Sequence, residues 1–594
     1  MSELRVEPLR TAEQESDSAL RSVFAALEAR ENFKLEAGAG AGKTYSLIRA
    51  LQHILSERSK YLPRADQQIA CLTYTNVARD EIVNRTDSSP FVFADTLHGF
   101  LWEMIRPYQK ALAQAILVAE KWQETLEGRT TLDGLEIDYD LGIRGIGDHV
   151  ATLHHDDVPG LAMELFKNAK FRALIADRFP IIFIDEYQDT PQGLVEAMLI
   201  GHKEDPLTSI YGIFGDHWQQ IYDKTCGSID HPAITAIPKN ANFRSGTTIV
   251  NFLNQLRPEL QQAAAEDAAV GTITIYHTNE WPGVRLGSNW KGQISHAASH
   301  QTLEWATADA REHRWTDATS DVKNLMLTHT SIANELGYES LPTIFKYNDA
   351  FIRKQDPVLA YLLDVVEPAA VAFQAHKYGD LFDVLGRSQP HIRSPRDKTR
   401  WTKFFENLNA LRANGTVGDV LDHLNGQKLF SIPSKVQHRQ TRLEEALTEL
   451  ESGTELSEPR LLEYQRLRSV SYAEIRALAA YVDDKTVFST KHNVKGAEFD
   501  NVVVVLGRGW SAYDFAKMLE NYPRRDQLND SERKSFERSR NLFYVAASRA
   551  KHNLVLVFTQ KLEQGALATL TNWVGDSNIV PVTFTDETTP APGL

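Results

Sequence analysis

The sequence predicts an α/β protein built on parallel β-sheets, and three stretches carry this prediction. Residues 32–48 pass from a partly apolar segment through a Gly/Ala-rich loop into a helical pattern. Residues 181–184 are consecutively apolar, as expected of a central parallel strand that is buried on both faces. A second run of this kind, residues 502–506, lies in the C-terminal part of the chain and indicates a second α/β unit.

The Gly/Ala-rich loop has the properties of a phosphate-binding loop. It ends in Gly42-Lys43-Thr44 directly before the helical pattern, and Ala37 replaces the first glycine of the usual pattern. Small residues let backbone N–H groups converge on phosphate oxygens, Lys43 supplies a positive charge, and the Thr44 hydroxyl is a ligand for Mg²⁺. We therefore predict a nucleoside triphosphate site with Mg²⁺. Its backbone contacts are expected from Ala37, Gly38, Ala39, Gly40, Ala41 and Gly42.

Two further strand patterns end in polar residues. Asp185 and Glu186 follow the run 181–184, and Gln219 lies shortly after the run 209–215. Ligands bind at the carboxyl ends of the strands in open α/β sheets, so these side chains are expected to face the phosphate-binding loop. Asp185 can hold the Mg²⁺, and Glu186 can act as general base on the attacking water. The combination predicts hydrolysis of a nucleoside triphosphate.

The composition limits the other classes of function. The net charge of −15 argues against a protein coated in basic surface, so any nucleic-acid contact must be a local groove. Two cysteines, Cys71 and Cys226, cannot form a four-cysteine metal site. No long apolar run and no signal-peptide core are present, which predicts a cytoplasmic protein with no membrane partner.

Two weaker candidates each leave two interpretations open. Gln14, in a charged helical pattern, either contacts a base or is simply solvated. The basic stretch 386–405 includes Arg396, Arg400 and Trp401, and it is either a surface that binds a nucleic-acid backbone or a solvated loop. Residues 258–271 read as a small-residue acidic helix or linker without chemistry.

Eight short motifs together resemble motifs I to VI of superfamily-one helicases, in particular the UvrD/Rep/PcrA branch. They stand in the same order along the chain as AGAGAGKT, LTYTNVARDEI, DTLHGF, IDEYQDT, GDHWQQIY, NFRS, TKHNVKGAEF and RNLFYVAASRAK. The resemblance implies two RecA-like P-loop NTPase domains with parallel sheets, each carrying an inserted helical subdomain. The implied boundaries are 1–98 and 172–245 for the first domain, 99–171 for its insertion, 246–346 and 483–575 for the second domain, 347–482 for its insertion, and 576–594 for a C-terminal tail.

The resemblance also implies roles for individual residues in ATP hydrolysis and in 3′-to-5′ movement on DNA. Lys43 and Thr44 would hold phosphate and Mg²⁺, Asp185 the metal, Glu186 the water, and Gln219 the γ-phosphate. Arg244 and Arg549 would be arginine fingers, Glu498 would bind the ribose, and Phe243 would stack on adenine with Tyr45 assisting. Contacts to single-stranded DNA would come from Tyr74, Thr75, Asn76, His98, Thr490 and His492. Arg244 and Arg549 can act as arginine fingers only if the second unit faces the first across a cleft.

The chain departs from this branch at one informative place. After residues 215–222 relatives carry an aromatic residue and an arginine that contact DNA, whereas this sequence reads Asp223-Lys224-Thr225-Cys226. A base-stacking platform is therefore missing or moved, with Trp218 as a substitute. No nuclease motif follows the last helicase motif, so cutting would need a nuclease subunit in trans. The compact size resembles the helicase subunits of Gabija anti-phage systems.

Two functions remain open at this point. The first is an ATP-dependent 3′-to-5′ helicase or translocase that acts on single-stranded or 3′-tailed DNA in repair or defence. The second is a nucleotide-gated DNA-end sensor, or assembly subunit of a nuclease complex, with little processive unwinding.

Overall fold

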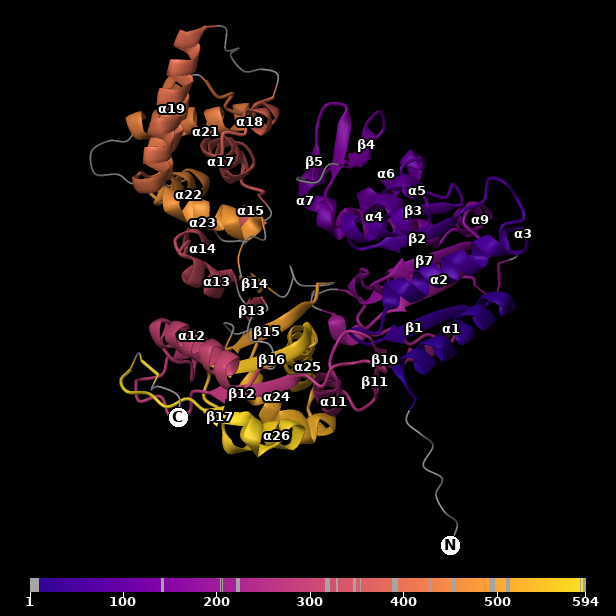
Figure 1. The fold of residues 1–594 in the computed structure, drawn as a ribbon. Helices are drawn as coiled ribbons and strands as arrows, with labels where there is room; N and C mark the ends of the chain where they lie inside the picture. Colours follow the sequence, from indigo (N-terminus) through magenta and orange to yellow (C-terminus); the bar gives the residue numbers. More distant parts are fainter. Residues whose placement is uncertain are drawn as a thin grey trace.

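The computed structural model contains two α/β units, a mixed insertion in the first and a helical bundle inserted in the second (Figure 1). It describes residues 10–590 apart from 140–143, 203, 206, 221–224, 316–320, 327–328, 346–348, 353, 387–393, 428, 450–455, 457, 484–485, 487, 491–496, 509–512 and 588. Among the helices of this described part, none combines the length and the apolar character needed to cross a membrane. The α/β fold class with two parallel sheets, predicted from the sequence, is confirmed.

The first unit is a six-stranded parallel sheet in the order β3-β2-β7-β8-β1-β9. Its strands are β1 (Asn32–Ala37), β2 (Ile69–Thr73), β3 (Val92–Thr96), β7 (Ile181–Asp185), β8 (Ile210–Gly215) and β9 (Ile234–Lys239). The central strand β7 is buried on both faces, because Ile181 and Phe183 pack in one apolar cluster and Ile182 and Ile184 in another. This arrangement brings the carboxyl ends of β1, β7 and β8 together at one edge of the sheet.

Helices cover both faces of the first sheet. They are α1 (Ala12–Ala29), α2 (Lys43–Ser56), α3 (Arg58–Tyr61), α4 (Asn76–Arg85), α5 (Leu97–Ile105), α9 (Ala169–Arg178) and α10 (Leu194–Met198). Short helical turns η2 (Tyr187–Asp189) and η3 (His217–Gln219) follow β7 and β8 directly. Side chains of Thr75 and Thr96 cap α4 and α5 by accepting backbone N–H bonds, which fixes where each helix leaves its strand.

The first insertion combines helices with a small sheet, whereas the resemblance implied a helical subdomain. Besides α6 (Gln109–Val118), η1 (Glu120–Trp122), α7 (Gln123–Leu126) and α8 (Asp157–Phe166), it contains a small sheet of β4 (Glu136–Tyr139), β5 (Gly145–Ile146) and β6 (Val150–Leu153). Ile137, Ala151 and Leu153 of this sheet are buried in the same apolar cluster as α6 and α8. The strands therefore complete the core of the insertion.

The second unit is a six-stranded parallel sheet in the order β14-β13-β15-β16-β12-β17. Its strands are β12 (Thr272–His277), β13 (Val322–Met326), β14 (Phe488–Thr490), β15 (Phe499–Leu506), β16 (Ala550–Phe558) and β17 (Ile579–Pro581). The described residues after α26 (Gln564–Val574) also contribute to this unit. Strand β17 pairs with β12, and the Trp281 indole donates to the carbonyl of Glu587 at 2.8 Å.

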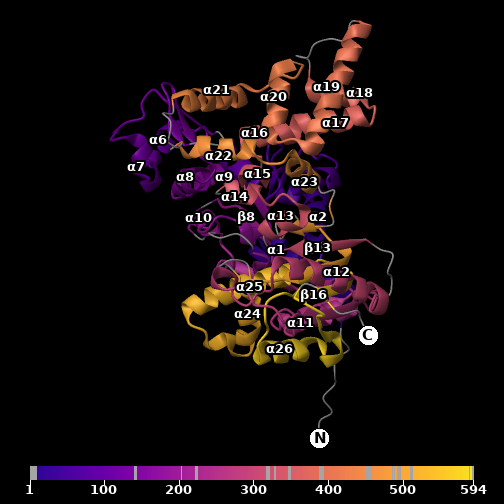
Figure 2. The same ribbon diagram turned by 90° about the vertical axis from the view of Figure 1, so that its left-hand side faces the viewer.

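One face of the second sheet is covered by α11 (Thr247–Leu256), α24 (Phe515–Asn521), α25 (Asp530–Ala547) and α26 (Gln564–Val574). The other face packs against α12 (His296–His313), and the apolar core on this face continues into the inserted bundle, which Figure 1 shows above the β13–β14 edge of the sheet and Figure 2 shows turned by 90°. Remaining short elements are η4 (Ser288–Trp290), η6 (Tyr522–Gln527), η7 (Asp576–Asn578) and the pair β10 (Ala241–Asn242) and β11 (Ala263–Ala264), which lies between the units.

The second insertion is helical throughout its described residues. The helices between β13 and β14 are α13 (His329–Leu336), α14 (Leu341–Ile344), α15 (Asp349–Ile352), α16 (Pro357–Tyr361), a π-helical turn (Leu362–Val366), α17 (Glu367–Gln374), α18 (Tyr378–Leu385), α19 (Pro395–Asn414), α20 (Val417–Gln427), α21 (Ser434–Glu449), α22 (Pro459–Arg468) and α23 (Tyr472–Val482). A buried bidentate ion pair joins α17 to α19, because the Arg412 guanidinium donates to both oxygens of Glu367 at 2.7 Å.

Candidate functional site

The phosphate-binding loop connects β1 to α2. Gly40 and Gly42 have φ values of +73° and +70°, a backbone region that favours glycine. A Cβ on Gly40 would lie 2.5 Å from the Asn242 side-chain oxygen, so this glycine is also required by space. Ala37 is the last residue of the extended strand β1, where alanine is suitable. The relaxed form of the motif therefore still gives a glycine-controlled turn.

The loop opens into a cleft of about 380 Å³ to which both α/β units contribute. Its lining residues are Gly38, Ala39, Gly40, Ala41, Gly42, Lys43, Thr44, Tyr45, Glu81, Arg85, Glu186 and Gln219 from the first unit and Phe243, Arg244, Glu498 and Arg549 from the segments that lead into or form the second. Most of the residues expected to bind nucleotide are thus brought together at one place.

The carboxylates after β7 stand next to the P-loop lysine. Lys43 Nζ lies 3.8 Å from Glu186 Oε2, and the Gln188 amide donates to the same oxygen at 2.6 Å. Glu186 has a φ of +51°, an unusual conformation for a residue with a side chain. Backbone strain of this kind concentrates at functional sites, where the surrounding contacts maintain it.

Thr44 and Asp185 are suited to hold Mg²⁺. Thr44 lines the cleft at the start of α2, and Asp185 is buried at the end of β7, directly before Glu186. Mg²⁺ prefers a few protein oxygens together with water and phosphate oxygens. A hydroxyl and a carboxylate beside a phosphate-binding loop fit this preference.

Gln219 is held in the cleft by Asp216. The Gln219 amide donates to Asp216 Oδ2 at 2.9 Å, while Asp216 Oδ1 accepts from the Trp218 backbone N–H at 3.0 Å. Asp216 Oδ1 also accepts from Arg257 at 2.6 Å. A buried carboxylate with a charged donor and two N–H donors is well compensated, so it can fix the orientation of Gln219.

The two predicted arginine fingers reach the cleft that contains Lys43. Arg244 Nε donates to Glu498 Oε2 at 3.0 Å, and its Nη1 donates to the Ser548 carbonyl at 3.1 Å. Arg549 is buried and donates to the carbonyls of Val545 and Ala497. Burial, followed by repulsion from Arg244, lowers the pKa of Arg549 to about 9. The condition set by the sequence analysis, that the second unit faces the P-loop unit, is met.

Glu498 is engaged by two cations in this arrangement. Besides Arg244, the Lys551 ammonium lies 3.1 Å from its carboxylate. Burial alone would raise the pKa of Glu498, but Arg244 and Lys551 lower it. The expected ribose contact would therefore have to compete with these ion pairs.

Two exposed aromatic rings also line the cleft. Tyr45 and Phe243 are 50% and 43% exposed, which is unusual for side chains of this size. The buried ammonium of Lys239 lies 5.8 and 5.9 Å from the two ring centroids and donates to Ser46 Oγ at 2.7 Å. Burial lowers the pKa of Lys239 to about 8. Gln14 is not part of the lining, since its side-chain oxygen accepts from Thr11 N–H in the cap of α1.

Sequence reasoning missed several residues that hold the phosphate-binding loop from outside. The Gln262 amide donates to the carbonyls of Ala39 and Ala241 at 3.1 and 2.8 Å, and the Asn242 amide donates to Ala39 at 3.2 Å. The Tyr544 hydroxyl accepts the Ala39 N–H at 3.0 Å. Residues 258–271, expected to carry no chemistry, thus supply a support for the loop. A polar residue within that small-residue stretch was the available signal.

Most of the expected DNA contacts follow β2 and β3 at the same edge of the first sheet. Tyr74 is 41% exposed, Thr75 is the cap of α4, and Asn76 is exposed at its first turn. His98 stacks on His155 of the insertion with ring centroids 3.6 Å apart. Burial and the neighbouring His155 lower the pKa of His98 to about 4. Thr490 ends β14, but its side chain and the whole of His492 lie outside the described residues.

The structure contradicts the exposed aromatic platforms considered in the sequence analysis. Trp401 is 4% exposed and packs against Phe382 and Phe405 in the core of the bundle, although Arg396 and Arg400 of the same helix are exposed. Trp218 is equally buried. Neither ring offers a face to a base in this arrangement, because both are surrounded by protein. Residues 221–224, where the motif departs from relatives, lie outside the described residues.

Comparisons with known proteins agree with this architecture. Residues 21–224 match the family model of an AAA domain, and residues 346–561 match that of the UvrD-like helicase C-terminal domain. The chain is 21% identical to the Gabija protein GajB of Bacillus cereus (strain HuB5-5), with 92% of this chain and 95% of that protein covered. It is 26% identical to the Gabija protein GajB of Bacillus cereus (strain VD045) over 41% of this chain and 50% of that protein.

Proposed function

We propose that this chain, a UvrD-like helicase, hydrolyses ATP between its two α/β units and uses the cycle to move 3′ to 5′ along single-stranded DNA. One observation carries the proposal. Lys43, Glu186 and Gln219 from the first unit, Arg244 from the segment that leads into the second unit, and Arg549 from the second unit line a single cleft. A triphosphate bound there would be contacted from both sides, so its hydrolysis would alter the relative position of the units.

The residues divide the chemistry among them. Lys43 and the loop N–H groups would bind the phosphates, and Mg²⁺ held by Thr44 and Asp185 would neutralise developing charge on them. Glu186 would orient the attacking water and accept its proton. Gln219 would contact the terminal phosphate.

The two arginines would stabilise the transferring phosphoryl group from the opposite side. Arg549 is buried beside the cleft, where a positive charge acts strongly because little water screens it. Arg244 would have to exchange its ion pair with Glu498 for the phosphate. Phe243 and Tyr45 would enclose the adenine, since both are exposed aromatic residues that line the cleft.

For the biological setting we propose anti-phage defence in the cytoplasm, together with a nuclease subunit. The support is the similarity to one Gabija protein of Bacillus cereus along nearly the whole chain. The proposed substrate is single-stranded or 3′-tailed DNA, contacted near Tyr74, Thr75, Asn76 and His98.

A second candidate is a nucleotide-gated DNA-end sensor that assembles with the nuclease and unwinds little. It is favoured by the burial of Trp218 and Trp401, because neither ring is exposed for stacking on successive bases. The two candidates share the nucleotide site and differ in whether hydrolysis separates strands.

The proposal is tested by ATP hydrolysis and by strand displacement. We expect single-stranded DNA to raise turnover, and Lys43→Ala or Glu186→Gln to abolish it. Lys167→Ala, an exposed lysine remote from the cleft, is the control and keeps wild-type turnover. Displacement from a 3′-tailed but not a 5′-tailed duplex supports the translocase. DNA-stimulated hydrolysis without displacement supports the sensor, and hydrolysis that no nucleic acid stimulates contradicts both.

A further inference from the structure

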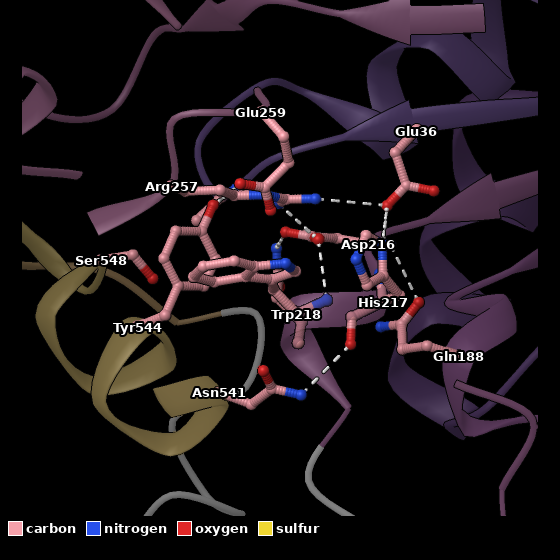
Figure 3. Close-up of polar contacts among 12 residues, drawn as sticks. Glu36, Gln188, Asp216, His217, Trp218, Arg257, Glu259, Asn541, Tyr544 and Ser548 are labelled. Carbon is pink, nitrogen blue, oxygen red and sulfur yellow. Dashed lines mark hydrogen bonds and ion pairs between the residues drawn. The ribbon is translucent and has the colours of Figure 1, made fainter. Parts of the chain in front are cut away.

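Trp218 belongs to the first unit but is buried in the core of the second. It lies in η3, directly before Gln219, and packs in the apolar cluster formed by α11, α24, α25 and the second sheet. Its ring meets Tyr544 of α25 edge-on with centroids 5.5 Å apart. Figure 3 shows Trp218 beside Tyr544 and Arg257. A bulky side chain placed in this way links the two units where they meet.

Two arginines of the second unit lie against the Trp218 ring. The Arg540 guanidinium carbon is 3.7 Å from the ring centroid, and that of Arg257 is 5.0 Å away. Cations are attracted to the face of an indole, most strongly where water is excluded. Arg540 is half-buried, and burial lowers its pKa to about 10. The ring is therefore held by charge as well as by packing.

Arg257 extends this contact into the nucleotide site. It follows α11 and donates to Asp216 Oδ1 at 2.6 Å, with Glu36 Oε1 at 3.4 Å. Burial opposes a charge on Arg257, but the carboxylates of Asp216, Glu36 and Glu259 raise its pKa. Asp216 in turn holds the Gln219 amide. The second unit thus contacts both the residue beside Gln219 and the carboxylate that orients it.

Two more contacts run in parallel across the same boundary. The Asn541 amide donates to the His217 carbonyl at 3.5 Å, and the Tyr544 hydroxyl accepts the Ala39 N–H of the phosphate-binding loop. Asn541 and Tyr544 both lie on α25, as does Arg540. A movement of α25 would therefore act on η3 and on the loop together.

A metal ion is not the better explanation for this polar cluster. Glu36, Asp216 and His217 offer ligand atoms that lie within 4.8 Å of one another. However, the Arg257 guanidinium is ion-paired with both carboxylates and already supplies the positive charge that they require. The cluster is a polar contact between the two units of the chain.

We propose that Trp218 is a positioning residue for hydrolysis: held by Arg257 and Arg540, it sets Gln219 according to the position of the second unit. The inference rests on the proposed ATPase function and adds to it the route by which the second unit controls the γ-phosphate contact. When Trp218 is displaced, Lys43 and Thr44 still bind ATP, whereas Gln219 loses its placement. A misplacement of about 1 Å at a reacting group can reduce turnover by roughly 100-fold.

The test uses the full chain with saturating single-stranded DNA and separates kcat from KM. Trp218→Leu removes the ring that the arginines contact, and Arg540→Met removes one of the two charges. We expect kcat to fall roughly 10- to 100-fold in Trp218→Leu, with KM for ATP within about twofold of wild type. Arg540→Lys retains the charge and is expected to recover much of the loss seen in Arg540→Met. The matched control is Trp573→Leu, which removes a ring from the same apolar cluster without touching the first unit.

Several outcomes would overturn the inference. They are an unchanged kcat in folded Trp218→Leu, a rise of KM alone, or an equal loss of kcat in Trp573→Leu. Circular dichroism shows whether Trp218→Leu folds. If it does not fold, Trp218→Phe and the two Arg540 variants test the inference in its place. Equal kcat in Arg540→Met and Arg540→Lys would contradict the role of the charge. Wild-type protein that hydrolyses no ATP with any DNA removes the proposed function and this inference together, whereas active wild type with unaffected variants removes the inference alone.

Discussion

The side-chain amide of Gln188 donates to the carboxylate of Glu186 at 2.6 Å, and its oxygen accepts the backbone N–H of Asp216 at 3.0 Å. Gln188 is fully buried, so this bridge between the ends of β7 and β8 is protected from water. It connects the proposed general base to the strand end that carries the residue for the terminal phosphate. The orientation of Glu186 therefore depends on a neighbouring strand as well as on its own backbone.

The first prediction concerns this bridge. Gln188→Ala removes one donor to Glu186 and the acceptor of the Asp216 N–H. We expect kcat for ATP to fall about 10-fold or more while KM stays nearly constant, because the residues that act on the water and on the terminal phosphate are affected rather than nucleotide binding. Steady-state hydrolysis with and without single-stranded DNA measures both constants. Gln68→Ala, an amide that bonds the Pro90 carbonyl away from the cleft, is the control. A change of KM without a change of kcat would show that Gln188 serves nucleotide binding instead.

The second prediction concerns the support of the phosphate-binding loop by Gln262. Gln262→Leu keeps the volume but removes the donor to Ala39 and Ala241. Loss of a buried hydrogen bond costs about 1–3 kcal/mol where an acceptor is left unpaired. We expect weaker nucleotide binding, by roughly 5- to 50-fold in Kd, because the loop is less well held in the conformation that presents its N–H groups. Titration with a fluorescent ATP analogue measures this, and Gln261→Leu, whose amide bonds carbonyls of its own segment, should leave Kd unchanged.

The residues that could be predicted from the sequence share one property. Lys43, Glu186 and Gln219 each belong to a short contiguous motif in which the local chain determines the chemistry, and all three line the cleft. The two sheets were predicted for a similar reason, since runs such as 181–184 and 502–506 are uninterrupted apolar segments.

Other features depend on contacts between distant segments, so no local pattern reveals them. Arg257 and Gln262 are isolated polar residues, and each donates to a residue of the first unit that is more than 40 positions away in the sequence. Trp401 is a different case, because its burial could have been predicted from the sequence. Trp401, Phe404, Phe405 and Leu408 follow the i, i+3, i+4, i+7 spacing of a buried helix face.

The third prediction is a pH dependence of stability caused by Lys239. Burial lowers its pKa from the usual 10.5 to about 8 in the folded protein. Between about pH 8 and 10.5 the unfolded chain therefore binds a proton at this lysine that the folded protein does not, so stability rises with pH in this window. Compared with Lys239→Met, the wild-type free energy of unfolding should increase by up to about 3 kcal/mol from pH 8 to 10.5.

Urea unfolding of both proteins at half-unit pH steps measures this difference for Lys239. Subtracting the variant removes the contribution of other groups that titrate in the same range. Parallel curves for wild type and Lys239→Met across the window would show that the ammonium is compensated in the folded state.

The fourth prediction concerns the buried ion pair of the helical bundle. Glu367→Gln leaves the Arg412 guanidinium buried without its counter-charge, and such a loss typically costs about 3–5 kcal/mol. The double variant Glu367→Met with Arg412→Met removes both charges and should recover most of this stability. Urea unfolding measures the three proteins. If Glu367→Gln were as stable as wild type, water would have to reach the Arg412 guanidinium in the folded protein.

The fifth prediction separates the basic face of α19 from its buried aromatic. Arg396 and Arg400 are exposed on this helix, whereas Trp401 is enclosed by Phe382 and Phe405. If the face binds a DNA backbone, Arg396→Gln with Arg400→Gln should weaken binding and reduce the salt slope by about 1.4, since each single-strand phosphate contact contributes about 0.7. Trp401→Phe should leave the DNA affinity unchanged and lower the unfolding temperature, because it changes packing alone. The control is Lys167→Gln with Lys170→Gln, an equal loss of charge on an exposed stretch of the first unit. Fluorescence anisotropy at several salt concentrations measures the DNA affinity and its salt dependence. Equal salt slopes for both double variants would mean that α19 does not contact DNA. Weaker binding in Trp401→Phe alone would mean that this ring becomes accessible when DNA binds.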